Sequence, residues 1–411
     1  GDDSEFEEKR FGQYLTSSQE ADEIAASNPL WTQVVAAGNS RSPLLNPTTA
    51  SQILPTLELF GDLAQKYDLG FNGKHQVWKP GMKKCTWPYS TSPHKSTLFD
   101  EGGYDTIQGG LATAKNVITV GAMADPPLAD AFDFTTGKWK PLQMKHVVTT
   151  NFSNWGPVDD GRIKPDVIAC GQAVLAPAIP QKCISSSCKP AGAAKDNASY
   201  ATLSGTSMAA PVVSGTVALL NELSIRHRGE RLRSDESKAL LIQTATSSNP
   251  DGAPGYQVGW GAINAELAGM VLTGQNDDEK IFLAEVHSEK TFTRKLNRVD
   301  FRPPRVTVVW IDQPGSKTNK LDLRDPRLVI DLDVKLVSPS GKEILPWRLD
   351  PEKPLAPATR GVNSVDNVER IDIPADEDEM GEWTLKIDGG KFKNKFTKTA
   401  AVAVWGFDDV E

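Results

Sequence analysis

Residues 204–220 read Ser204-Gly205-Thr206-Ser207-Met208-Ala209-Ala210-Pro211-Val212-Val213-Ser214-Gly215-Thr216-Val217-Ala218-Leu219-Leu220. Gly205 permits a sharp backbone turn with no Cβ in front of the Ser207 hydroxyl. From Ser207 onward nearly every residue is small or apolar, which predicts a buried helix that opens at this serine. Pro211 fits the first turn of that helix, where a missing N–H costs no intrahelical hydrogen bond.

A serine at the N-terminus of a helix lies beside free N–H groups and the positive end of the helix dipole, which together stabilise an anion. Such an anion forms when a serine attacks an acyl group, as the oxygen of the tetrahedral intermediate. The alternative is a serine that only caps a core helix, which is a common role. The string is much longer than a cap requires, so we favour Ser207 as a nucleophile.

The 204–220 string resembles the nucleophile segment of the subtilisin-like serine proteases (subtilases, peptidase S8 family). Residues 114–122, 152–157, 160–166 and 259–261 resemble the same family. We assign these segments no chemistry and expect them to build the sheet and its edges, with Lys164 and Asp166 as a solvated or structural pair. The resemblance covers residues from about 30 to 268 and implies the C-terminal two-thirds of a subtilisin-like domain.

Asn39 is the second candidate residue. The apolar run 33–37 predicts a buried strand, and Gly38-Asn39 predicts a turn at its end. The resemblance implies that the Asn39 amide and the Ser207 N–H form an oxyanion hole, although an Asn in a turn is common without such a role. It also implies that Ala36, Ala37 and Gly38 line one wall of the substrate pocket, where small side chains leave room for a large apolar group.

A serine nucleophile needs a general base, and the base needs an orienting carboxylate. In subtilases both precede the oxyanion Asn, in Asp-Ser/Thr-Gly and His-Gly-Thr-His motifs, and neither motif occurs here. All five histidines follow Asn39, and we expect none to act as the base: His75, His94, His146, His227 and His287. The expectation is that an upstream segment, absent from this chain, supplies the Asp and the His. Alone, the chain should be nearly inactive.

The fold class expected for residues 1–274 is α/β, a parallel sheet flanked by helices, because strand-like and helical segments alternate. The predicted strands are 33–37, 115–122 and 163–169. The predicted helices are 10–30, capped by Ser18, then the Ser207 helix, 235–245 and one from 263. Residues 40–70 read as a loop with a short helix, and the polar stretch 71–105 reads as a surface insert.

Residues 275–411 are expected to form a second, all-β domain. After a linker at 275–279, strand-like segments appear at 305–311, 328–337, 383–387 and 400–407, with turns at 339–341 and 388–390. This pattern predicts an antiparallel β-sandwich or jelly roll. Residues 332–334 and 366–370 resemble the jelly-roll domain fused behind some large bacterial subtilases.

The composition of the chain limits its partners. The 411 residues carry a net charge of −8 without a long basic block, so we expect no nucleic-acid partner. No apolar run reaches the roughly 20 residues of a membrane helix. The acidic N-terminus is not a signal peptide, but a secreted mature chain would have lost one. We expect a secreted enzyme acting on protein or peptide substrates, or alternatively an inactive subtilase-like scaffold that binds peptides or glycans.

The cysteines could form disulfides, and the acidic residues could bind a metal ion. Cys183 and Cys188 flank a short polar loop and either form a disulfide or stay reduced; Cys85 and Cys170 either pair or are free. Their spacing is not that of a zinc site. The chemistry requires no cofactor, but structural calcium, which binds oxygen ligands, is an open expectation. Candidates are Asp322, Asp325, Asp331, Asp333 and Asp366, which solvated turns explain equally well.

Overall fold

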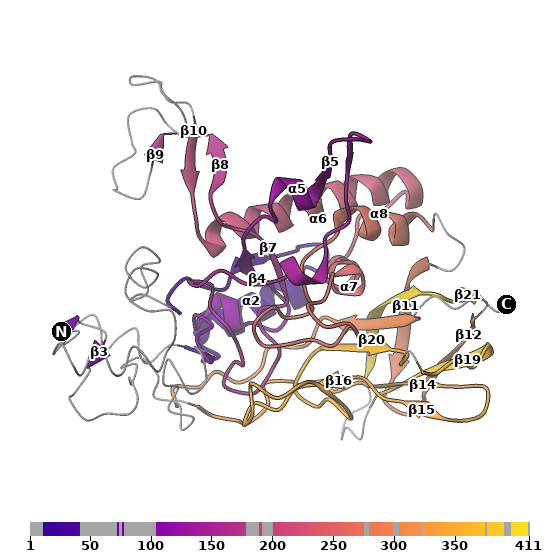
Figure 1. Ribbon diagram of the computed structural model, residues 1–411. Helices are drawn as coiled ribbons and strands as arrows, with labels where there is room; N and C mark the ends of the chain where they lie inside the picture. Colours follow the sequence, from indigo (N-terminus) through magenta and orange to yellow (C-terminus); the bar gives the residue numbers. More distant parts are fainter. Residues whose placement is uncertain are drawn as a thin grey trace.

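The structure is a computed structural model that describes residues 11–41, 72–73, 76–77, 104–177, 189–190, 200–274, 279–298, 304–320, 322–374, 376–389 and 396–409. Helices and a small parallel sheet occupy one part of the molecule, and long antiparallel strands occupy the lower right of Figure 1. Several sequence predictions lie outside the described residues: Cys85, Cys183, Cys188, the 42–70 loop, most of the 71–105 insert and linker residues 275–278.

The parallel sheet has the order β1-β4-β7, with β1 at Val34–Ala36, β4 at Ile118–Met123 and β7 at Val167–Cys170. A parallel bridge from Ile168 to Ala262 extends it beyond β7. All of β4 is buried because helices and neighbouring strands cover it. The expectation of a parallel sheet is confirmed, but β1 is only half-buried, because it is an edge strand of the sheet formed by the described residues.

The main helices are α2 (Thr16–Ser27), α6 (Thr206–Arg228), α7 (Ser234–Thr244) and α8 (Ala265–Thr273). Helix α6 packs against β1, β4 and β7, and α7 and α8 pack against one another. The length of α6 and its mean hydropathy of 1.4 also suit a membrane-crossing helix. Its packing against the parallel sheet is that of a core helix.

Helix α2 differs from its prediction in two respects. Its N-cap is Leu15, and Ser18, the predicted cap, lies in the first turn, where its Oγ accepts the Leu15 N–H at 2.9 Å. Ile24 is 46% exposed although helical periodicity groups it with the buried Ala21 and Ala25, whereas the carboxylate of Asp22 is buried. Asp22 accepts hydrogen bonds from backbone N–H groups near the start of β4, including that of Asn116 at 2.8 Å, so a polar contact replaces the expected apolar one.

The C-terminal part consists of antiparallel sheets. Strands β11 (Glu279–His287), β20 (Thr397–Trp405), β13 (Arg305–Trp310) and β18 (Val368–Asp372) form one sheet in that order. A second contains β15 (Glu343–Ile344), β14 (Asp333–Val337), β19 (Gly381–Asp388), β12 (Phe292–Arg298) and β21 (Asp408–Asp409). A core that includes Trp310 and Trp383 lies between them. The predicted strand 328–337 begins only at Asp333, and β11, β12 and β18 were not predicted.

Short elements complete the described fold. They are η1 (Leu111–Thr113), α5 (Leu128–Ala131), η2 (Met144–His146) and the strand pairs or ribbons β2 (Asn72–Gly73) with β3 (Gln76–Val77), β5 (Phe132–Asp133) with β6 (Lys138–Trp139), β8 (Val174–Pro177) with β10 (Tyr200–Leu203) and β9 (Lys189–Pro190), and β16 (Trp347–Arg348) with β17 (Thr359–Arg360). Cys170, at the end of β7, is a free thiol, and burial raises its pKa to about 12.

One hydrophobic cluster contains residues from both parts of the chain. The cluster around α6 and α7 also contains Val309, Val368 and Ala401 from the antiparallel strands. Helix α7 packs on β13 and β20, and α8 packs on β11. The β-rich part therefore covers apolar surface that the α/β part would otherwise expose to water.

Candidate active site

Ser207 is the second residue of α6, and its side chain is exposed. The N–H groups of Met208 and Ala209 turn back to the Gly205 carbonyl, at 2.9 and 3.3 Å. The Ser207 N–H has no acceptor among the described residues. An exposed hydroxyl and an unused N–H thus lie together at the positive end of a long helix, as the sequence predicted.

Asn39 lies against the start of α6. Its Oδ1 accepts two hydrogen bonds from Thr206, from the backbone N–H at 2.7 Å and from Oγ1 at 3.0 Å. Thr206 Oγ1 in turn accepts the Gly38 N–H at 3.2 Å. The Asn39 Nδ2 lies on the Gly205 side, 3.4 Å from the place of a Cβ on that glycine. Because the amide oxygen is engaged, the NH2 group is the part that can donate to a ligand beside Ser207.

Asn154 holds the turn that carries Asn39. Its backbone N–H donates to the Gly38 carbonyl at 3.1 Å, its Nδ2 donates to the Ala37 carbonyl at 3.3 Å, and its Oδ1 accepts the Ser40 N–H at 2.8 Å. Asn154 is fully buried. Gly38 has φ +109°, and a Cβ there would lie 2.2 Å from the Asn154 Nδ2, so this close approach requires glycine.

Ala36, Ala37 and Gly38 follow one another at the carboxyl end of β1. Ala36 is half-buried and pairs with Val120 of β4. The Ala37 side chain is 0% exposed and belongs to a small apolar cluster with Ile107. The edge that they form leads directly to Asn39.

Sequence analysis missed Thr206 and Asn154 as positioning residues. Thr206 was quoted only as part of the string before Ser207, and Asn154 only as part of residues 152–157. The available signal was that both strings resemble the same family. The contacts themselves join Asn39 to a residue 167 positions away and Ser40 to one 114 positions away, which no local pattern reveals.

Comparison with known proteins shows which family the chain belongs to. Residues 11–261 match the model of the subtilase family, peptidase S8. The chain belongs to the subtilase family. It is 30% identical over 191 residues to the serine protease AprX of Bacillus subtilis, covering 46% of this chain and 36% of that protein. It is 30% identical over 184 residues to a C5a peptidase of Streptococcus pyogenes, covering 42% and 14%.

The matched region is thus about a third of the length of AprX and less of the C5a peptidase. Among solved structures, the patellamide maturation protease PatA is 27% identical, with 43% of this chain and 50% of that chain covered. Its TM-score is 0.28, too low to bear on the fold.

No hydrogen bond joins a described histidine of this subtilase to Ser207. His146 lies 3.0 Å from Asp130, between their Nε2 and Oδ2 atoms. His287 Nδ1 lies 2.9 Å from Thr397 Oγ1, and His227 is near the far end of α6. His75 and His94 lie outside the described residues.

The exposed side of α6 carries apolar side chains that no described residue covers, together with the exposed Glu222–Arg226 ion pair. Val212, Leu219 and Ile225 are 39%, 65% and 49% exposed, and a Cβ on Gly215 would meet no atom within 4 Å. The opposite face, which includes Val213, is buried in the core. An apolar face on a helix is normally covered by another element.

Lys164 and Asp166 form a buried structural pair. The Asp166 carboxylate lies 2.5 Å from Lys164 Nζ and 2.8 Å from Lys238 Nζ, and it accepts the Thr119 N–H at 2.7 Å. Burial alone would raise the pKa of Asp166, but the two ammonium groups outweigh it and lower the pKa. The pair ties β4, β7 and α7 together, with no part in the Ser207 site.

The five predicted calcium candidates do not come together in one group among the described residues. Of these five, Asp322 alone belongs to the three-carboxylate group found among the described residues, where it joins Asp105 and Asp159. Asp325 is exposed. Asp366 accepts the Ile163 N–H at 2.9 Å and an Asn363 N–H at 3.0 Å, so protein donors already occupy it.

Proposed function

We propose that this subtilase is a serine endopeptidase in which Ser207 is the nucleophile and the Asn39 amide and Ser207 N–H are the oxyanion donors. The observation that carries the proposal is the pair of hydrogen bonds from Thr206 to Asn39 Oδ1. They hold the Asn39 carboxamide next to the residue that precedes the serine, with its NH2 group available. The named peptidase relatives support a peptide substrate.

In the proposed reaction Ser207 Oγ bonds to the scissile carbonyl carbon, and the carbonyl electrons move onto its oxygen. The Asn39 NH2 and the Ser207 N–H stabilise that oxyanion. The hydroxyl proton passes to a histidine base and then to the leaving amine, and water later hydrolyses the acyl-enzyme. In subtilisin, loss of the equivalent Asn donor costs about 10²–10³ in rate, a magnitude taken over from that enzyme.

The histidine and its orienting carboxylate are proposed to come from a polypeptide segment outside this chain. That segment would be an upstream part of the same protein, retained after cleavage if the two are separate. Two observations support this: no described histidine is bonded to Ser207, and α6 exposes Val212, Leu219 and Ile225. Packing of the segment on this face would bury these side chains and bring its base near the helix start.

Ala36, Ala37 and Gly38 are proposed to line one wall of the substrate pocket, with the peptide lying as an added strand beside them. Support comes from their position, since they lead along one edge to the Asn39 turn. Because the side chain of Ala37 is buried, a bound peptide would contact the Ala37 backbone, Ala36 and Gly38.

The remaining proposals concern the molecule as a whole. Residues 1–274 are proposed as the catalytic domain and 275–411 as a jelly-roll domain, supported by antiparallel pairing of every described ladder after Glu279. Catalysis in subtilases requires no cofactor. Secretion is proposed from the extracellular action that the name C5a peptidase suggests for one relative.

The alternative is a catalytically inactive scaffold that binds peptides or glycans, and the lack of a histidine at Ser207 within the described residues favours it. A fluorophosphonate probe, which labels activated serines, separates the two in protein expressed with its upstream sequence. We expect labelling that Ser207→Ala abolishes. Ser214→Ala, an exposed serine on the same helix, should leave labelling intact.

An unlabelled but folded complete protein would favour the scaffold. Rapid peptide turnover by the 411-residue chain alone would contradict the proposal that its base lies elsewhere.

A further inference from the structure

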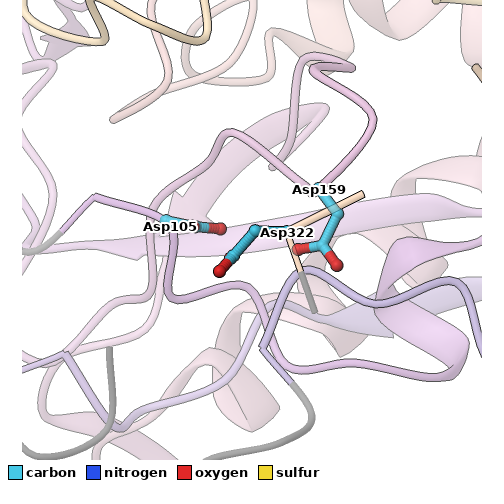
Figure 2. Close-up of side chains that lie close together, drawn as sticks. All are labelled: Asp105, Asp159 and Asp322. Atoms are coloured by element: carbon cyan, nitrogen blue, oxygen red, sulfur yellow. The ribbon is translucent and has the colours of Figure 1, made fainter. Parts of the chain in front are cut away.

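Three carboxylates from distant parts of the chain meet where the two parts of the molecule join. Asp105 is the last residue of the predicted insert, Asp159 lies in the turn before β7, and Asp322 lies in the loop between β13 and β14. One oxygen of each lies within 4.8 Å of the others. Figure 2 shows that the three side chains lie close together.

Asp159 is the unusual member of this group. It is only 3% exposed, and neither carboxylate oxygen has a hydrogen-bond partner among the described residues. Buried carboxylates are normally paired or hydrogen-bonded, because an uncompensated charge is costly in a protein interior. The nearby Arg324 offsets part of this charge, but its Nη1 donates to the backbone carbonyl of Asp159, at 2.7 Å, and not to the carboxylate.

Charge repulsion is correspondingly strong. The negative charges of Asp105, Asp322 and Asp160 all act on the buried carboxylate of Asp159. A bound positive charge would remove this penalty.

The backbone holds the group in place. The Asp159 N–H donates to the Gly12 carbonyl at 3.1 Å, and the Asp105 N–H donates to the Gly156 carbonyl at 3.0 Å. A Cβ on Gly12 would lie 2.1 Å from Asp159 Oδ1 and 3.0 Å from Asp105 Oδ1. Glycine at position 12 therefore leaves room for the Asp159 carboxylate to lie against the backbone.

We propose that Asp105, Asp159 and Asp322 bind a divalent cation of the calcium type, which fastens the Asp322 loop to the α/β part of the chain. All three ligands are oxygens, which hard cations prefer over softer metals. Oxygens on opposite sides of a calcium ion lie about 4.6–5.2 Å apart, and neighbouring ligands lie closer, so the separations fit. Half-buried Asp322 leaves access for the water that would complete the coordination shell.

The test is calcium binding by chelator-treated protein, followed by isothermal titration calorimetry and by thermal unfolding in calcium, magnesium or EDTA. We expect calcium to raise the Tm by several degrees and magnesium to do less. Asp159→Asn should weaken calcium affinity by at least about tenfold, as loss of even an outer partner of a metal does. The matched control is Asp325→Asn, an exposed carboxylate on the same loop, which should bind like the wild type.

If Asp159→Asn does not fold, Asp322→Asn replaces it, because Asp322 is less buried. Wild-type protein that binds no calcium, or an equal loss of binding in Asp159→Asn and Asp325→Asn, would overturn the proposal. So would a Tm that responds to pH but not to calcium, since the carboxylates would then be held by shared protons. None of these readouts depends on peptidase activity.

Discussion

At the scale of single residues, the site depends on a small hydrogen-bonded bridge. Thr206 donates twice to Asn39 and accepts once from Gly38, so its hydroxyl links the Asn39 turn to the helix that carries Ser207. Asn154 fixes the same turn from the other side. Neither residue touches the reacting atoms in our proposal; both position the group that does.

Replacing Thr206 by Val keeps the side-chain size and removes the bridge. We expect kcat of the complete protein to fall about tenfold, the rate equivalent of about 1.4 kcal/mol, because Asn39 loses one of its two anchors. KM should change little, since the loss falls on the transition state. Steady-state kinetics measure both. A raised KM with unchanged kcat would mean that Thr206 serves substrate binding.

At the scale of secondary structure, α6 buries one apolar face and leaves several further apolar side chains uncovered within the described structure. A buried face is expected of a core helix, but Leu219 on the other face is 65% exposed. Burial of such a leucine stabilises an association by about 1.5–3 kcal/mol. This surface is the strongest structural support for a missing partner segment.

Leu219→Glu should affect the 411-residue chain and the complete protein differently. In the 411-residue chain we expect thermal stability within about 0.5 kcal/mol of wild type, as for other surface substitutions. In the complete protein the same change should weaken retention of the upstream segment, measured by co-purification, and reduce labelling of Ser207. If wild-type and Leu219→Glu forms of the complete protein retain the upstream segment and label Ser207 equally, nothing packs on this face.

The elements show what sequence can and cannot predict. Apolar runs placed β4 and β7 correctly, because burial on both faces leaves an unbroken hydrophobic signal, and α6 and α7 also lie where they were predicted. Strand β12, Phe292–Arg298, alternates with charged residues and was missed. Ser207 and Asn39 were predicted from motifs and remain proposals, whereas Thr206, Asn154 and the Asp159 cluster depend on contacts between distant segments.

At the scale of the whole molecule, buried polar contacts join the two parts of the chain. Lys115 Nζ lies 2.6 Å from Asp312 Oδ2, and both side chains are 0% exposed. Lys115 also donates to the carbonyls of Gln313 and Arg327. The α/β part and the β-rich part therefore unfold as one unit in this account.

Asp312→Ala should destabilise the chain by about 3–5 kcal/mol, because the Lys115 ammonium is left buried without its partner. Glu343→Ala breaks the exposed Lys335–Glu343 pair and should cost no more than about 1 kcal/mol. Urea unfolding measures both. Similar small effects would show that the interface between the two parts contributes little.

Asp366 makes that interface sensitive to pH. Burial raises the pKa of Asp366 to about 6, against an unfolded value near 3.9. The folded state then holds a proton that the unfolded state has released, so this contribution is full below about pH 4 and is lost as pH rises through about 6. The expected loss is about 2–3 kcal/mol between pH 4 and pH 7, relative to Asp366→Asn. Parallel stability profiles of the two proteins would contradict it.

The most direct measurement is a crystal structure of the complete protein with a peptidyl boronic acid, which mimics the tetrahedral intermediate. We predict a bond from Ser207 Oγ to boron, and one boronate oxygen within about 3 Å of both Asn39 Nδ2 and the Ser207 backbone nitrogen. A bound inhibitor attached to another residue, or an oxygen that faces away from Asn39, would contradict the account.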